Sequence, residues 1–201
     1  SSGGNVKDMD RFTGSDLEPA PIRHEYRNGI QRLTLGLYNL EVPVIAAVNG
    51  PAMGAGLDLC TLCDIRIAAE SARFCEAFIN VGIIPGDGGA WLLPRVVGMA
   101  RAAEMALTGQ VLTAQQALDY GLVSHVVPDS ELMNTAMSLA HDMSTKGGEV
   151  LRLTKRLLRE GQNMPLASHL EMAAAFQALA HRTPEHAAAV ESFKNRKKPV
   201  A

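Results

Sequence analysis

The chain has 201 residues, of which 47% are hydrophobic and 20% are charged, and 19 Lys and Arg against 21 Asp and Glu give a formal net charge of −2. This balance is typical of a folded globular protein and excludes a long disordered chain and a basic surface that would favour nucleic acid or an anionic membrane. No apolar stretch approaches the roughly 20 residues of a spanning helix and no apolar signal core follows the N-terminus, so we expect a soluble, cytoplasmic protein with no membrane or nucleic-acid partner.

The first part of the chain predicts a loop, a helix and a buried strand, in that order. Residues 10–21 mix charged residues with Gly, Ser and Pro, as loops do. Residues 22–40 carry Ile and Leu at the i, i+3, i+4 spacing of one amphipathic helix. The apolar run "PVIAAV" at 43–48 then predicts a strand buried on both faces, as in a parallel sheet covered by helices.

The rest of the chain changes from mixed elements to helices alone. We expect further strands at 64–70, 72–78 and 122–127, and a turn-rich loop over 82–90. We expect helices at 56–62, from near 88, at 99–107, 114–120, 130–145, 149–161, 166–181 and 184–195. The sequence therefore divides into an α/β core, residues 1–127, and an α-helical part, residues 128–201.

The cysteines do not indicate a disulfide framework or a metal site. Cys60, Cys63 and Cys75 are an odd number in a chain of this size. Cys60 and Cys63 form a C-x-x-C pair, but no second pair or histidine cluster follows at zinc-ligand spacing. We expect buried thiols and no metal.

Two turns of small residues can each present bare backbone. In "AVNGPAMGAGLDL", residues 47–59, a strand passes through Gly54, Ala55 and Gly56 into a helix that carries Asp58. Free N–H groups at a helix N-terminus favour an anion, and small residues let it approach. The turn "SSGGN" at 1–5 can offer a second donor, and two such donors form an oxyanion hole. The alternative is that both stretches are only tight turns.

Two longer stretches carry a resemblance to a known family. "PVIAAVNGPAMGAGLDLCTLCDIRIAAESARF" and "VGIIPGDGGAWLLPRVVGMARAAEMALTGQVLTAQQALDYGLVSHVVP" are similar to the crotonase superfamily, the enoyl-CoA hydratase/isomerase family. The resemblance implies an α/β fold, a spiral of ββα units whose α-helical C-terminal region packs into homotrimers or hexamers. It also implies strands before residue 1, so we expect this sequence to lack the N-terminal part of that fold. The substrate implied is an acyl-CoA thioester, with no cofactor besides the coenzyme A of the substrate.

The resemblance also implies roles for the two turns. The Ser2 and Ala55 N–H groups match the two oxyanion donors of the family. The turns around them match its acyl-CoA site, which adds Gly3, Gly4, Asn5 and Gly56 as substrate-binding residues. Trp91 either walls the acyl pocket or belongs to the core, where an aromatic residue in an apolar helical run is usually found.

The carboxylates depart from the hydratase pattern. Hydration needs a base and an acid, and Asp58 matches the first of the two family positions. The second position is Phe78, which cannot transfer a proton and which we expect to contact the substrate as a binding residue. Asp87 in "PGDGG" either supplies the missing acid or caps a helix. Glu76 would face the same side as Phe78 on an extended strand and substitute for it, or it lies at the surface or in an ion pair.

The sequence thus predicts an acyl-CoA enzyme that stabilises a thioester enolate, with enoyl-CoA hydratase as the leading activity. Asp58, helped by Asp87 or Glu76, would transfer the protons. A double-bond isomerase or C–C hydrolase is the alternative reaction, since one well-placed acid can suffice. A catalytically inactive CoA-binding member is the alternative of a different class.

Overall fold

The computed structural model divides the chain into two compact units. The first comprises Ser1–Leu40 and Val44–Met137, and the second comprises Glu41–Pro43 and Ser138–Ala201. The residues that the structure describes are 1–5, 7, 9, 12–13 and 18–196. Residues 10–11 and 14–17 of the expected loop lie outside them. The sequence pattern divides the chain after residue 127, which is where the last strand ends. That this point is also a domain boundary stays a prediction.

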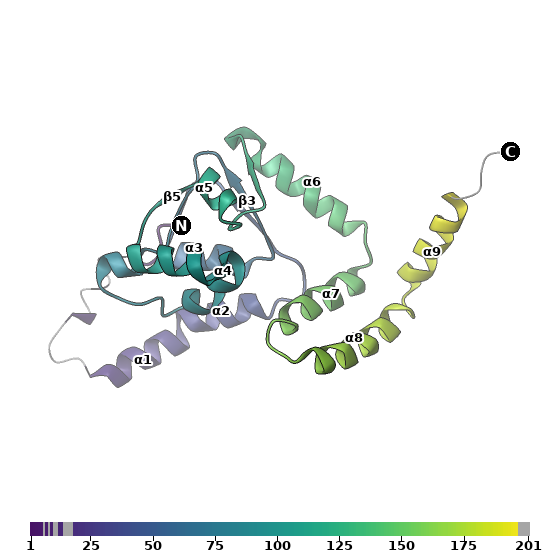
Figure 1. Cartoon of the computed structure of the whole chain (residues 1–201), viewed down its shortest axis with the longest axis horizontal. Helices are drawn as coiled ribbons and strands as arrows, with labels where there is room; N and C mark the ends of the chain where they lie inside the picture. Colours follow the sequence, from purple (N-terminus) through teal and green to yellow (C-terminus); the bar gives the residue numbers. More distant parts are fainter. Residues whose placement is uncertain (6, 8, 10–11, 14–17, 197–201) are drawn as a thin grey trace. The chain divides into compact units, whose positions relative to one another are not determined.

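Two short helices replace the single helix expected over 22–40. They are α1, Pro19–Asn28, and α2, Ile30–Tyr38 (Figure 1). Gly29 separates them with a non-helical φ of −100° and ψ of −110°. A Cβ at this position would lie 2.7 Å from the Glu25 carbonyl oxygen, so the sharp change of direction requires glycine. The periodicity of the apolar residues predicted the helical state but not this break.

The strands form two small sheets. The first is parallel, in the order β1-β3-β6, and the expected strands supply it: β1, Ile45–Val48; β3, Ile65–Ala69; and β6, His125–Val127. The second has the order β2-β4-β5 and contains β2, Pro51–Met53; β4, Arg73–Cys75; and β5, Leu112–Thr113. β2 pairs parallel with β4, which pairs antiparallel with β5. β2 and β5 were not expected, because strands this short show no alternation.

The strand expected over 72–78 ends early. β4 stops at Cys75, and a 3-10 helix, η2, runs over Ala77–Val81. The argument that Glu76 and Phe78 face the same side of one extended strand is therefore wrong. Alternation applies only within a strand, and a 3-10 helix turns the chain by a third of a turn per residue.

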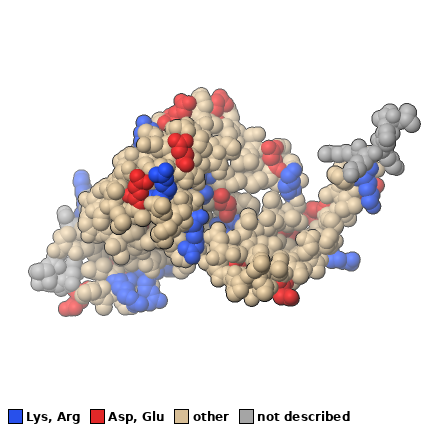
Figure 2. Space-filling model, in the orientation of Figure 1, with Lys and Arg blue, Asp and Glu red and all other residues tan. Residues whose placement is uncertain are grey.

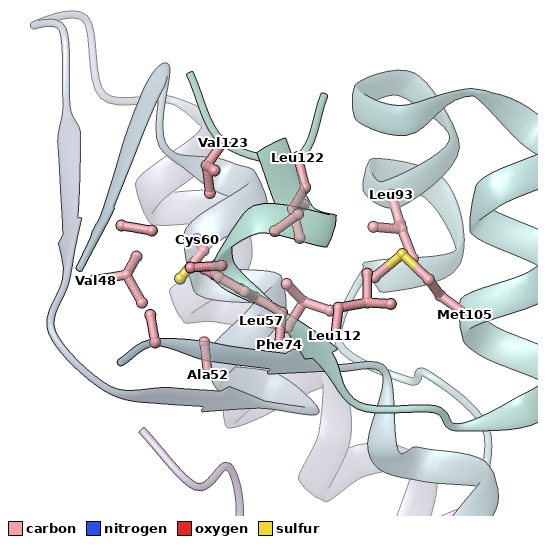
Figure 3. Close-up of a cluster of buried hydrophobic side chains, with 14 of the residues drawn as sticks. Val48, Ala52, Leu57, Cys60, Phe74, Leu93, Met105, Leu112, Leu122 and Val123 are labelled. Carbon is pink, nitrogen blue, oxygen red and sulfur yellow. The ribbon is translucent and has the colours of Figure 1, made fainter. Parts of the chain in front are cut away.

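Helices α3, Ala55–Leu62, α4, Gly89–Thr108, and α5, Ala114–Asp119, surround the core of the first unit. Gly98 interrupts α4 with a φ of 78°, so its two halves correspond to the two helices expected there. Thr113 caps α5 in a reciprocal capping box with Gln116, as its position predicted. Leu57, Phe74 and Met105 meet in a fully buried cluster (Figure 3), which fixes α3 between the second sheet and α4. Cys60 and Cys75 are buried, Cys63 is half-buried, and no disulfide joins any of these three described cysteines.

Helices make up the second unit. A 3-10 helix, η3, Asp129–Glu131, precedes α6, Leu132–Ser144, which begins in the first unit and continues into the second. The helices α7, Gly148–Glu160; α8, Leu166–Ala180; and α9, Pro184–Arg196, follow near their expected positions. No helix in the described part of the chain is both long enough and apolar enough to cross a membrane. On the face shown in Figure 2, basic and acidic side chains are interspersed among uncharged ones.

Candidate active site

The turn between β2 and α3 presents backbone N–H groups at the start of a helix. Gly54, with a φ of 51°, connects the two elements, and its own N–H donates to the Cys75 carbonyl oxygen at 2.8 Å. The Gly54 carbonyl oxygen accepts from the N–H groups of Leu57 and Asp58, which closes the first turn of α3. Ala55 is the first residue of the helix, and within the described residues its N–H has no acceptor. This donor is therefore free to bind an oxygen of another molecule.

The N-terminal segment lies directly against this turn. The Ser1 carbonyl oxygen accepts from the Met53 N–H at 3.0 Å. A Cβ on Gly3, where φ is +83°, would lie 2.7 Å from the Met53 carbonyl oxygen and 3.5 Å from the Ala55 nitrogen. A Cβ on Gly56 would lie 2.4 Å from the Ser1 carbonyl oxygen. Only glycine at both positions lets the two backbones approach so closely, and this approach brings the segment that carries Ser2 beside Ala55.

The remaining members of the first turn lie farther out. Gly4 and Asn5 are exposed. The nearest atom to a Cβ on Gly4 would be Met9 Cε, at 3.8 Å, and Asn5 Oδ1 accepts from the Lys7 N–H at 3.2 Å. Ser1 and Gly3, rather than Gly4 and Asn5, are thus the residues of this turn that lie against the start of α3, and Ser2 stands between them in the chain.

Asp58, Glu76 and Asp87 come together in the interior of the first unit. Their exposed fractions are 2%, 1% and 4%. A Cβ on Gly89 would lie 2.4 Å from Asp58 Oδ1 and 2.4 Å from Glu76 Oε1, so both carboxyl groups occupy the space that a side chain at position 89 would need. Neither oxygen of Asp58 or Glu76, nor Asp87 Oδ1, has a hydrogen-bond donor. The surface or ion-paired position considered for Glu76 is therefore wrong.

Burial and mutual repulsion keep a proton in this cluster at neutral pH. Burial raises the pKa of Asp58 to about 10, and the neighbouring carboxyl groups of Asp87 and Glu76 act in the same direction. Burial and the charge of Asp87 raise the pKa of Glu76 to about 7, against the opposing effect of a hydrogen bond with Asp58. A protonated Asp58 can donate to a neighbouring carboxylate, which ionised carboxylates cannot do. The site therefore holds a buried proton donor beside proton acceptors.

Side chains of α2 hold the loop that carries Asp87. Gln31 Nε2 donates to the Gly86 carbonyl oxygen at 2.8 Å, and Thr34 Oγ1 donates to the Asp87 carbonyl oxygen at 2.5 Å. These contacts fix the backbone of the loop while the Asp87 side chain stays in the cluster. Sequence reasoning found neither Gln31 nor Thr34, because the spacing of apolar residues in a helix does not indicate a hydrogen-bond partner more than 50 residues away.

The two aromatic candidates have different surroundings. The half-buried Phe78 ring lies on η2, and its Cζ would be 3.5 Å from a Cβ on Gly54. This ring therefore borders the turn that presents the Ala55 N–H. Trp91 is 40% exposed, packs edge-on to Tyr38 with ring centroids 5.5 Å apart, and has the Arg95 guanidinium carbon 3.7 Å from its ring centroid. Its placement in the core is wrong, and an acyl-binding role stays a prediction.

Sequence reasoning also missed Gly89, which packs against the carboxyl cluster. It is the first residue of α4 and is buried against two carboxyl groups. The signal was the last glycine of "GDGG", which a helix start alone does not require.

Comparison with known proteins shows that nearly the whole chain is similar to enzymes named for acyl-CoA substrates. A family model described as enoyl-CoA hydratase/isomerase matches residues 1–200. The chain is 42% identical over 186 residues to 1,2-epoxyphenylacetyl-CoA isomerase of Escherichia coli K12, an alignment that covers 90% of this chain and 70% of that protein.

Solved structures of similar sequence have the same fold as this chain. The enoyl-CoA hydratase of Bacillus anthracis superposes with a TM-score of 0.88 at 33% identity, over 99% of this chain and 75% of that one. An enoyl-CoA hydratase/isomerase from Cupriavidus metallidurans CH34 gives 0.91 at 34% identity, over 98% and 73%. The chain thus shares their α/β fold and spans about three quarters of their length.

Proposed function

The chain belongs to the enoyl-CoA hydratase/isomerase family, the crotonase superfamily, and from this premise we propose that it binds an acyl-CoA thioester, forms its enolate and moves a proton along the acyl chain. The observation that carries this proposal is the buried cluster of Asp58, Glu76 and Asp87, in which both oxygens of Asp58 and Glu76 and Oδ1 of Asp87 have no hydrogen-bond donor among the described residues. Unpaired buried carboxyl groups are costly to a fold, and they are expected where proton transfer needs them.

The thioester oxygen would lie between the N–H groups of Ser2 and Ala55. The absence of an acceptor for the Ala55 N–H and the close approach of Gly3 to this residue support that position. The N-terminal end of α3 adds a partial positive charge. Two such donors stabilise the negative charge of the enolate, and loss of one costs about 2.7–4 kcal/mol in enzymes where it has been measured.

Asp87 and Asp58 would then move the protons. In isomerisation, ionised Asp87 takes a proton from one carbon of the acyl chain, and the electron pair of that C–H bond enters a dienolate. Protonated Asp58 gives its proton to the carbon at the other end of the conjugated system, and the double bond shifts. A proton passing from Asp87 to Asp58 restores the starting state. The proximity of these two carboxyl groups supports that last step.

Phe78 favours isomerisation over hydration. Hydration needs an ordered water and a group that activates it. The Phe78 ring lies beside Gly54 and has no polar atom, so it can neither hydrogen-bond to a water molecule nor deprotonate it. Isomerisation needs no water, so an apolar wall does not impede it.

Hydration is the second candidate. Asp58 and Glu76 lie against one another. A hydratase needs one group to activate water and one to deliver a proton, and two neighbouring carboxyl groups can do both. The Bacillus anthracis enoyl-CoA hydratase has the same fold. In this alternative Glu76 would supply the second acid in place of Phe78.

An assay in deuterated water with 2-enoyl-CoA and 3-enoyl-CoA thioesters separates the candidates. We expect the two isomers to interconvert, with deuterium entering the acyl chain, and hydration of crotonyl-CoA to be at least about tenfold slower. Faster hydration would favour the second candidate. Binding of acyl-CoA without any turnover would contradict both and indicate an inactive CoA-binding member.

The helical second unit supports assembly into a homotrimer or a hexamer, which we propose as the working form. Large apolar side chains on α7, α8 and α9 are exposed: Leu158, Leu166, Leu170, Leu179 and Phe193, by 57–72%. Exposed apolar surface on this scale is typical of protein interfaces. Light scattering coupled to size exclusion should give three or six times the mass of one chain, and a monomer at micromolar concentration would contradict the proposal.

A further inference from the structure

Glu76 is buried in a place where its charge has no counterion. It lies between the end of β4 and the start of η2, with an exposed fraction of 1%. Its Oε1 and Asp58 Oδ1 share the space over Gly89, and neither Glu76 oxygen accepts a hydrogen bond from a described donor. A buried carboxylate without a hydrogen-bond donor is unfavourable, because it has lost its hydration without a replacement. This arrangement is stable only if a neighbouring group brings a proton.

We propose that Glu76 is a positioning residue that keeps Asp58 protonated, by holding a negative charge and an acceptor oxygen against it beside Gly89. The inference rests on the proposed function, because it concerns the proton that Asp58 delivers. Glu76 itself touches no reacting atom in this scheme. It acts through Asp58, whose protonated form relieves the repulsion between the two groups and donates the hydrogen bond that Glu76 otherwise lacks.

The other groups that face Asp58 and Glu76 cannot neutralise the charge of Glu76. Asp87 contributes a further negative charge to both carboxyl groups. Cys75 lies beside Glu76 and Cys60 beside Asp58. Burial raises the pKa of Cys75 and raises that of Cys60 to about 11, so both thiols stay neutral. No described Lys or Arg pairs with either carboxylate. Proton sharing with Asp58 is therefore the remaining way to relieve the charge of Glu76.

The test is the pH profile of kcat/KM for isomerisation in the Glu76→Gln variant. Glutamine keeps the size of the side chain but carries no charge, so Asp58 should lose its proton at lower pH. We expect the alkaline limb of the profile to move down by about 1 pH unit or more. Glu76→Asp, which retains the charge, should leave the limb near its wild-type position. Glu104→Gln, which removes an exposed charge on α4, should not move it.

A second measurement needs no variant. In the wild-type protein labelled with carbon-13 at Asp carboxyl groups, the Asp58 signal should stay that of a protonated acid above neutral pH and shift as Glu76 ionises. An unmoved alkaline limb in Glu76→Gln, or an Asp58 signal that titrates in the usual acidic range, would overturn the inference. The proposed function fails separately, if Asp58→Asn leaves isomerisation intact.

Discussion

Asp58→Asn is expected to lower kcat for the acyl-CoA reaction by about 10²-fold or more, which is the contribution of a positioned acid or base. Asparagine has the same shape but cannot release a proton at neutral pH. Binding of the thioester should change little, because the oxyanion donors are backbone groups. Steady-state kinetics and calorimetric titration with a non-reacting acyl-CoA measure the two effects separately.

The same variant is expected to be more stable than the wild type at alkaline pH. The folded state raises the pKa of Asp58 from 3.8 to about 10, so the folded protein binds this proton more tightly than the unfolded chain does. This group's contribution is complete below pH 3.8 and is lost as the pH rises toward 10, so wild-type stability falls across that window. Asparagine does not ionise, and the advantage of the variant should grow with pH, to about 1–3 kcal/mol at pH 9.

Chemical denaturation of both proteins at pH 5, 7 and 9 checks this dependence. Val48→Ala, a core substitution away from the carboxyl groups, is the control and should lower stability by a similar amount at every pH. A catalytic loss in Asp58→Asn without a pH-dependent gain in stability would show that Asp58 is ionised in the folded protein. Unchanged kcat would remove Asp58 from the mechanism.

Much of the fold followed from local patterns. The run "PVIAAV" predicted β1, and Thr113 predicted the start of α5 from its capping chemistry alone. The break at Gly29 could not be predicted, because it depends on the approach of the Glu25 carbonyl oxygen. Likewise, β2 and β5 could not be predicted. Both pair with β4, which lies between them in the sheet, and segments of two or three residues are too short to show an alternation of apolar and polar side chains.

The residues of the candidate site could likewise be predicted only in part. The resemblance to the family singled out Asp58 and Asp87, whereas Glu76 was chosen from its spacing to Phe78 on a strand that the structure does not have. The structure brings the three side chains together from α3, the loop before α4 and the end of β4. Burial of Glu76 could not be foreseen, because a lone Glu is usually exposed and the reason for its burial lies in other segments. Their protonation depends on this shared burial, so it is a property of the fold and not of the motif.

Gly89→Ala tests the geometry of the cluster without touching a titratable group. The new methyl group would lie 2.4 Å from both Asp58 Oδ1 and Glu76 Oε1, distances at which something must move. Alanine is otherwise well suited to a helix start, and φ at this position is not in the left-handed region. Displacement of a reacting group by about 1 Å can cost about 10²-fold in rate, so we expect a loss of that size in kcat.

Gly148→Ala is the matched control for Gly89→Ala, since Gly148 is the first residue of α7 and a Cβ there would meet nothing within 4 Å. It should change stability by less than about 0.5 kcal/mol and leave kcat unchanged. Gly89→Ala should instead destabilise the protein by about 1–3 kcal/mol, as overpacking of a filled interior does. Thermal unfolding and kcat measured together decide the outcome. Full activity in Gly89→Ala would mean that Asp58 and Glu76 do not converge over this residue, because no arrangement with both oxygens there admits a methyl group.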